Sequence, residues 1–268
     1  MEVEKRVRLL DAAFDKAKAA DYATALEEFE FLESQSEHPQ DIAPLRLFQA
    51  SCLTDMRKAA EALDRIRSVD QSQLGFANLV VFEFEYARIL RALGDREDAL
   101  KRTRNALKAI DTVDDKKPTE VVARNLHTLW GVLLAELGRC DEAIPVLEQV
   151  PVEDEGWADA SLHLGDCKYK KRQYRDAIKH YQDVVSCKKG NGPFLSQAAL
   201  RNIGYAFYDL EEYATAVEYL TKVEGQYDAY PDMKKELFSI LASSYLHMGK
   251  PSEAQKYRYP SSGSQLLQ

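Results

Sequence analysis

The stretch Gly165-Asp-Cys-Lys-Tyr-Lys-Lys-Arg-Gln-Tyr-Arg-Asp-Ala-Ile-Lys-His-Tyr181 decides the fold of this chain. Its small residues, Gly165 and Ala177, stand twelve positions apart, and the aromatic Tyr181 follows four positions after the second. A polar break, Arg172-Gln173, separates two segments in which apolar residues recur at helical spacing. The stretch therefore predicts two short amphipathic helices joined by a tight turn.

The same pattern recurs along nearly the whole chain. Seven alanines mark it, with spacings of 37, 37, 44, 34, 39 and 38 residues: Ala25, Ala62, Ala99, Ala143, Ala177, Ala216 and Ala254. A small residue stands twelve positions before each of them: Ala13, Ala50, Ala87, Gly131, Gly165, Gly204 and Ala242. Small residues at fixed sites let two helices approach closely. One such hairpin cannot bury its own apolar face, so neighbouring hairpins are expected to stack.

The pattern resembles the tetratricopeptide repeat (TPR) family, whose unit is a 34-residue helix–turn–helix. The stretch quoted above and residues 204–220 match the family best. The resemblance implies an all-α fold, a right-handed α-solenoid of seven TPR-type hairpins. We expect one solenoid over residues 1–258, with repeats near 6–39, 43–76, 80–113, 124–157, 158–191, 197–230 and 235–258.

Departures and insertions mark the predicted ends and loops. The seventh unit has Arg258 where an aromatic residue is usual, and Pro260 follows, so its second helix is expected to be short. Residues 111–120 are rich in charge and read as an extended loop, and residues 188–193 carry the strongest turn signal. Residues 259–268 form an uncharged irregular tail with no visible capping helix.

Composition narrows the possible partners and location. The net charge of −8 disfavours binding to a phosphate backbone, so no nucleic acid is expected as a partner. The N-terminus shows no signal-peptide pattern, and no apolar run is long enough to span a membrane. The four cysteines have no CxxC spacing, which suits reduced thiols in the cytoplasm.

Motifs of catalysis and cofactor binding are missing from the sequence. It contains no GxxxxGK[ST], GxGxxG, HExxH or GxSxG motif. His163 and Cys167 are spaced to share a helix face, but a zinc site needs at least three protein ligands and no third lies nearby. We therefore expect no enzyme activity, no metal and no cofactor.

The family resemblance implies that the first helix of each hairpin lines a concave groove where partner segments lie. Placing the sequence in that register predicts a partner-binding groove at seven residues: His163, Asp166, Tyr169, Arg201, Asn202, Tyr205 and Tyr208. Tyrosine and arginine are enriched in binding hot spots, because they combine large contact area with polar reach. The same register places Glu85 and Arg88 of an earlier repeat at groove positions.

The chaperone-binding subclass of the family holds two carboxylates with a clamp of Lys, Asn, Asn, Lys and Arg. Asn202 falls at one clamp position, but Leu162, Asp166, Glu236 and Ile240 occupy the others. Docking of an acidic EEVD-type tail is therefore disfavoured.

The sequence thus favours a non-catalytic protein-interaction scaffold that binds a protein or peptide segment in the groove. Two alternatives remain open. The chain could self-associate as a homo-oligomer through its uncapped C-terminal end, or it could be the regulatory arm of a larger enzyme or signalling protein.

Overall fold

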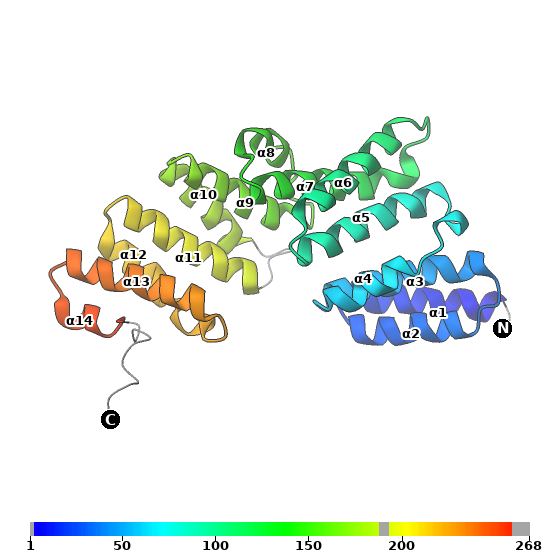
Figure 1. Cartoon of the computed structure of the whole chain (residues 1–268), viewed down its shortest axis with the longest axis horizontal. Helices are drawn as coiled ribbons and strands as arrows, with labels where there is room; N and C mark the ends of the chain where they lie inside the picture. The colour runs from blue at the N-terminus through cyan, green and yellow to red at the C-terminus, as the bar shows by residue number, and fades with distance from the viewer. Residues whose placement is uncertain (1–2, 188–192, 259–268) are drawn as a thin grey trace, which may run out of the picture. The chain divides into compact units, whose positions relative to one another are not determined.

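The structure, a computed structural model, describes residues 3–187 and 193–258 (Figure 1). The described residues form α-helices and three short 3-10 helices, and no strand occurs among them. The α-helices are α1 (Val3–Lys18), α2 (Tyr22–Ser34), α3 (Pro39–Asp55), α4 (Ala59–Arg67), α5 (Phe76–Ala92), α6 (Arg96–Asp111), α7 (Glu120–Glu136), α8 (Cys140–Leu147), α9 (Trp157–Lys170), α10 (Tyr174–Ser186), α11 (Pro193–Asp209), α12 (Tyr213–Thr221), α13 (Pro231–His247) and α14 (Pro251–Gln255). The 3-10 helices are η1 (Gln71–Gln73), η2 (Lys117–Thr119) and η3 (Glu224–Tyr227). The all-α fold class is confirmed.

The chain divides into two compact units, Met1–Leu137 and Gly138–Gln268, here called the N-terminal unit and the C-terminal unit. The first contains α1 to α7 and the second α8 to α14. In both units, consecutive helices run back alongside one another as hairpins, such as α1 with α2 and α9 with α10 (Figure 1).

Left-handed turns join the helices of the hairpins at one fixed place. Seven described residues have positive φ, each seven positions after the first small residue of its repeat: Ala20, Arg57, Gly94, Gly138, Arg172, Glu211 and Gly249. In a typical case, the N–H of Glu212 donates to the carbonyl oxygen of Phe207 at 2.9 Å, the six-to-one bond that closes a helix C-terminus. The polar breaks seen in the sequence are therefore Schellman-type turns.

The small-residue register predicts helix contacts correctly. Six of the seven marker alanines have no exposed surface, and Ala254 is 4% exposed. A Cβ atom added to Gly165 would lie 2.5 Å from the Tyr181 ring, and one added to Gly204 would lie 2.4 Å from Leu220. Glycine is needed at these two positions because a large side chain of the second helix rests on the first helix.

Each unit has its own apolar core. In the N-terminal unit, the ring of Phe14 packs edge-on against Phe29 and Phe48, with centroids 5.4 and 4.7 Å away. In the C-terminal unit, buried Tyr181 and Ile203 belong to one cluster between α9, α10 and α11. Partly exposed side chains of α9 and α11, such as Tyr169 and Phe207, pack against that cluster.

The expectations for loops and ends can be compared with the structure where it describes them. The last helix, α14, has five residues, as the sequence led us to expect. The segment before α7 is not extended throughout, because residues 117–119 form η2. The predicted turn at residues 188–193 falls mostly outside the described residues, and the tail at 259–268 lies wholly outside them. The count of seven repeats, the handedness and the single solenoid domain remain predictions.

Candidate functional site

A pocket of about 330 Å³ lies in the C-terminal unit, where α9, α11 and α13 come together. These are the first helices of three successive hairpins. We call it the first-helix pocket, and its lining residues are Asp166, Tyr169, Lys170, Tyr181, Arg201, Asn202, Tyr205, Met233 and Glu236. Five of the seven residues predicted from the sequence therefore meet in one cavity.

Asp166 organises the floor of the first-helix pocket. One of its carboxylate oxygens accepts hydrogen bonds from the Tyr181 hydroxyl at 2.8 Å and from the Asn202 side-chain amide at 2.9 Å. The amide oxygen of Asn202 then accepts from Nε and Nη2 of Arg201, at 3.2 and 3.0 Å. This chain of contacts fixes the Asn202 amide and the Arg201 guanidinium relative to the backbone of α9 and α11.

Arg201 has no carboxylate partner among the described residues. Its guanidinium carbon lies 5.9 Å from the Tyr205 ring centroid and 5.5 Å from that of Tyr227, and its Nη1 lies 3.8 Å from the sulfur of Met233. Aromatic faces attract a cation but do not neutralise its charge. The first-helix pocket therefore presents a positioned cation, without an ion-pair partner among the described residues, beside a thioether.

The Tyr205 hydroxyl is buried and has no hydrogen-bond partner within the described part of the chain. Burial raises the pKa of this phenol, and the nearby Glu236 carboxylate raises it further, although the Arg201 cation opposes them. The group consequently stays protonated at neutral pH and keeps a hydrogen bond to give. A buried polar atom without a partner is costly, so this hydroxyl marks a place where a ligand atom would be stabilised.

Tyr169 stands at the rim of the first-helix pocket. Its hydroxyl donates to the carboxylate of Asp209, and its ring packs edge-on against Tyr174 at a centroid distance of 5.3 Å. Burial raises the pKa of Tyr169, and the Asp209 acceptor adds to the effect. Tyr169 therefore bridges α9 and the C-terminal end of α11.

The two remaining predicted residues lie outside the lining. The Nδ1 atom of His163 lies 2.8 Å from the Asp159 carbonyl oxygen and 3.2 Å from the Asp159 carboxylate. Tyr208 shares a hydrogen bond of 2.8 Å with Ser243, and its ring packs edge-on against Tyr213. Both side chains are partly buried. His163 joins one turn of α9 to the next, and Tyr208 joins α11 to α13.

Sequence reasoning missed two residues of the first-helix pocket, Tyr181 and Met233, and it placed Glu236 at a clamp position without including it in the predicted binding groove. Tyr181 belongs to a second helix, α10, and reaches the pocket because its ring passes over Gly165. Gly165, sixteen positions before Tyr181, was the feature of the sequence that could have predicted this approach. Met233 lies in the first turn of α13, where nothing in the sequence separated lining residues from other exposed ones.

The N-terminal unit has a pocket of about 410 Å³ on its own first helices, α3, α5 and α7. Arg88 lies in its wall and pairs with Asp55 and, at 2.9 Å, with Glu85. Burial raises the pKa of Glu85, although the Arg88 cation opposes the shift. The groove register placed Glu85 at the surface, whereas it is only 5% exposed beneath Arg88. Here the register was wrong because a long arginine side chain covers the shorter carboxylate.

Among residues 3–187 and 193–258, no group of three or more His, Cys, Asp or Glu side chains is arranged to hold a metal ion. None of the described helices combines the length and apolar character that a bilayer span requires.

Comparison with known proteins identifies the repeat. Residues 159–186 match a family model described as tetratricopeptide repeat, and this segment contains the whole of the stretch, residues 165–181, that decided the fold. A search of curated protein sequences finds no match.

Solved structures with the same fold cover nearly the whole chain. The apo quorum sensor NprR from B. thuringiensis has a TM-score of 0.71 at 15% identity, over 96% of this chain and 75% of that one. A Rap protein complexed with competence and sporulation factor has a TM-score of 0.70 at 14% identity, over 95% and 75%. A tetratricopeptide repeat protein from Parabacteroides merdae has a TM-score of 0.57 at 14% identity, over 95% and 91%. At these identities, the likeness concerns the fold.

Proposed function

Since the chain is a tetratricopeptide-repeat protein, we propose that it is a non-catalytic scaffold that binds an extended segment of a protein partner in the first-helix pocket. The observation that carries the proposal is the buried Tyr205 hydroxyl without a partner, next to the Arg201 cation without a carboxylate. Both groups point to a ligand that brings hydrogen-bond acceptors into the cavity.

An extended peptide supplies such acceptors at every residue, because each backbone carbonyl oxygen has two lone pairs. The Tyr205 hydroxyl and the remaining N–H groups of the Arg201 guanidinium are donors that suit those oxygens. Met233, which is 39% exposed, offers a flexible apolar contact for a side chain of the segment. Asp166 and Glu236 balance the charges of Lys170 and Arg201, so a segment of mixed polarity fits better than a uniformly charged one.

Support for a bound ligand comes from a protein of the same fold. The Rap structure contains competence and sporulation factor, and this chain covers 75% of that protein. We extend the proposal to the predicted neighbours His163 and Tyr208, which lie on the same helices as the cavity and would contact a longer segment. The proposal also includes a cytoplasmic location, which follows from the cysteine pattern, and it excludes a membrane and nucleic acid as partners, which follows from the short apolar runs and from the net charge of −8.

The test begins with affinity capture using the intact chain as bait, followed by binding measurements on the purified partner. Truncation of a hot-spot aromatic typically costs about 2 kcal/mol, which is about a thirtyfold loss of affinity. We expect Tyr205→Ala and Arg201→Ala to show losses of that order while retaining the helical circular dichroism of the wild type. Tyr208→Ala reports whether the segment extends beyond the cavity.

A matched control is Tyr230→Ala, which removes a tyrosine that is 49% exposed and lies outside the pocket lining. Its affinity should equal that of the wild type. If folded Tyr205→Ala and Arg201→Ala variants bind the partner within about twofold of wild type, the first-helix pocket is not the binding site.

A further inference from the structure

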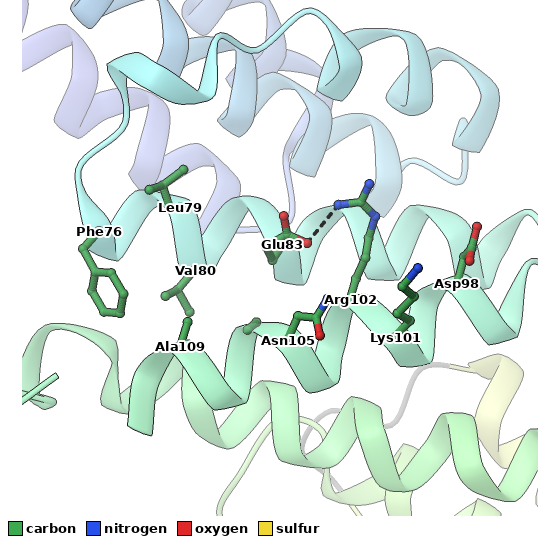
Figure 2. A pocket seen from close by; sticks show the side chains of 10 residues that line it. Phe76, Leu79, Val80, Glu83, Asp98, Lys101, Arg102, Asn105 and Ala109 are labelled. Carbon is green, nitrogen blue, oxygen red and sulfur yellow. Dashed lines mark hydrogen bonds and ion pairs between the residues drawn. The ribbon is translucent and has the colours of Figure 1, made fainter. Parts of the chain in front are cut away.

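Another cavity lies in the N-terminal unit, shares no lining residue with the first-helix pocket, and has a volume of about 420 Å³. All its lining residues come from α5 and α6, which form one hairpin (Figure 2). Figure 2 shows them as two facing rows, with Phe76, Leu79, Val80 and Glu83 on α5 and Asp98, Lys101, Arg102, Asn105 and Ala109 on α6. We call this cavity the hairpin groove.

The hairpin groove is apolar at one end and polar at the other. Phe76 is 38% exposed, and Leu79, Val80 and Ala109 continue the apolar floor beside it. Towards the other end, Arg102 donates to Glu83 at 2.9 Å and stacks on the Tyr86 ring at 3.7 Å from the centroid. The row on α6 spans from residue 98 to residue 109, roughly 16 Å or three helical turns.

The end of α4 leaves this groove open. Its last residue, Arg67, lies within 3.4 Å of the Tyr86 hydroxyl, about one turn along α5 from Glu83. No residue of α4 lines the cavity. A short helix placed in the groove would therefore lie against both α5 and α6.

The flank of α6 beside the groove carries an unusual charge pattern. Lys101, Arg104 and Lys108 are exposed, and no carboxylate in the described part of the chain is within ion-pair distance of any of them. They stand at spacings of three and four, so they are neighbours on the helix surface, where like charges destabilise the helix. The chain is acidic overall, at −8, which makes a concentrated basic flank a local feature.

We propose that the hairpin groove docks an acidic amphipathic helix of a partner protein. Apolar side chains of that helix would lie on Phe76, Leu79 and Ala109, and its carboxylates would pair with Lys101, Arg104 and Lys108. This binding mode is a helix in a groove, with anchors at helical spacing. The apolar floor favours an amphipathic protein helix over a nucleic acid, which would use the cations and leave the floor exposed.

The test uses a defined probe, a fluorescein-labelled peptide of about 14 residues, long enough to cover three turns. Leucines at spacings of three and four form its apolar face, and glutamates flank them on both sides. Binding is measured by fluorescence anisotropy at two salt concentrations, with a glutamine-for-glutamate peptide and a single-stranded DNA of about 12 nucleotides as comparisons. We expect saturable binding of the acidic peptide, which weakens as the salt concentration rises.

Two pairs of matched variants locate the site. The combined variant Lys101→Glu, Arg104→Glu and Lys108→Glu should bind the peptide at least about tenfold more weakly. The combined variant Lys16→Glu, Lys235→Glu and Lys256→Glu has the same total charge, changes exposed lysines elsewhere, and should bind like wild type. Phe76→Ser should weaken binding, whereas Phe31→Ser, which removes a phenylalanine that is 50% exposed on α2, should not.

Three results would overturn the proposal: equal weakening by the two charge-reversal variants, tighter binding of the DNA than of the peptide, or no saturation up to about 1 mM peptide. The charge-reversal variants change only exposed side chains and leave the buried core intact. We therefore expect them to fold like wild type, which circular dichroism checks. Tyr205→Ala should leave probe binding unchanged, which separates this groove from the first-helix pocket.

Discussion

At the scale of single residues, the turn positions show where the chain accepts an unfavourable conformation. Three of the seven left-handed turn residues are glycines, but Ala20, Arg57, Arg172 and Glu211 take φ values near +60° with a side chain present. A non-glycine residue in this region typically costs about 1 kcal/mol or more. The turn geometry is imposed by the two helices, which must reverse direction within a few residues to pack against each other.

Replacing Glu211 with glycine is expected to stabilise the protein by about 0.5–1 kcal/mol. The strain at φ +62° is relieved, and the exposed side chain makes no hydrogen bond or ion pair with another described residue that would be lost. Urea unfolding at neutral pH measures the change. Gly249→Ala, at φ +71°, is the reverse substitution at the equivalent turn and should destabilise. A Glu211→Gly variant that unfolds at lower urea than wild type would show that the turn is not strained.

At the scale of elements, ion pairs between helices join neighbouring hairpins. Glu33 of α2 accepts hydrogen bonds from Arg46 of α3 at 2.7 Å, from Gln49 at 3.0 Å and from Arg65 of α4 at 3.3 Å. One carboxylate thus connects three helices. Burial acts to raise the pKa of Glu33, but the hydrogen bonds from Arg46 and Gln49 and the two arginine charges outweigh burial, so the pKa lies below its usual value.

A lowered pKa in the folded protein fixes the sign of the pH dependence. The contribution of Glu33 to stability is present above the pKa of the unfolded state, about 4.3, and is lost as the pH falls through the lower folded value. Glu33→Gln should therefore reduce the free energy of unfolding by about 1–2 kcal/mol at pH 7. The difference from wild type should shrink as the pH falls below about 4. Unfolding curves at several pH values test this, and a deficit that is independent of pH would contradict it.

At the scale of the whole molecule, repeat proteins gain their stability from contacts between neighbouring hairpins, so a local defect is expected to remain local. Gly165→Ala introduces a methyl group 2.5 Å from the Tyr181 ring, which forces α9 and α10 apart at a typical cost of about 1–3 kcal/mol. Hydrogen exchange should accelerate in α9, α10 and α11 and remain unchanged in α1 and α2.

The matched control for this prediction is Gly225→Ala. A Cβ atom added there has no heavy atom within 4 Å, so hydrogen exchange should be unaffected throughout the chain. Uniform acceleration across both units in Gly165→Ala would instead indicate that the molecule opens as a single cooperative body.

The sequence by itself determined the hairpin unit, its turns and the helix faces of the candidate site. These features depend on residues three to sixteen positions apart, such as Gly165 with Tyr181, and helical geometry converts such spacings directly into contacts. Helical spacing places Asp166 with Tyr169 on one helix face and Arg201 with Tyr205 on another, whereas the expectation that these two helices line one groove came from the resemblance to the TPR family.

Only the tertiary structure decided which of these groups have partners. The carboxylate of Asp166 is occupied by Asn202 and Tyr181, while the hydroxyl of Tyr205 has no partner in the described structure. The tertiary structure alone also revealed that Glu85 is buried beneath Arg88 and that the hairpin groove is open beyond Arg67. Hydrogen bonding and burial depend on how far each side chain reaches across a helix interface, which residue spacing along one chain does not specify.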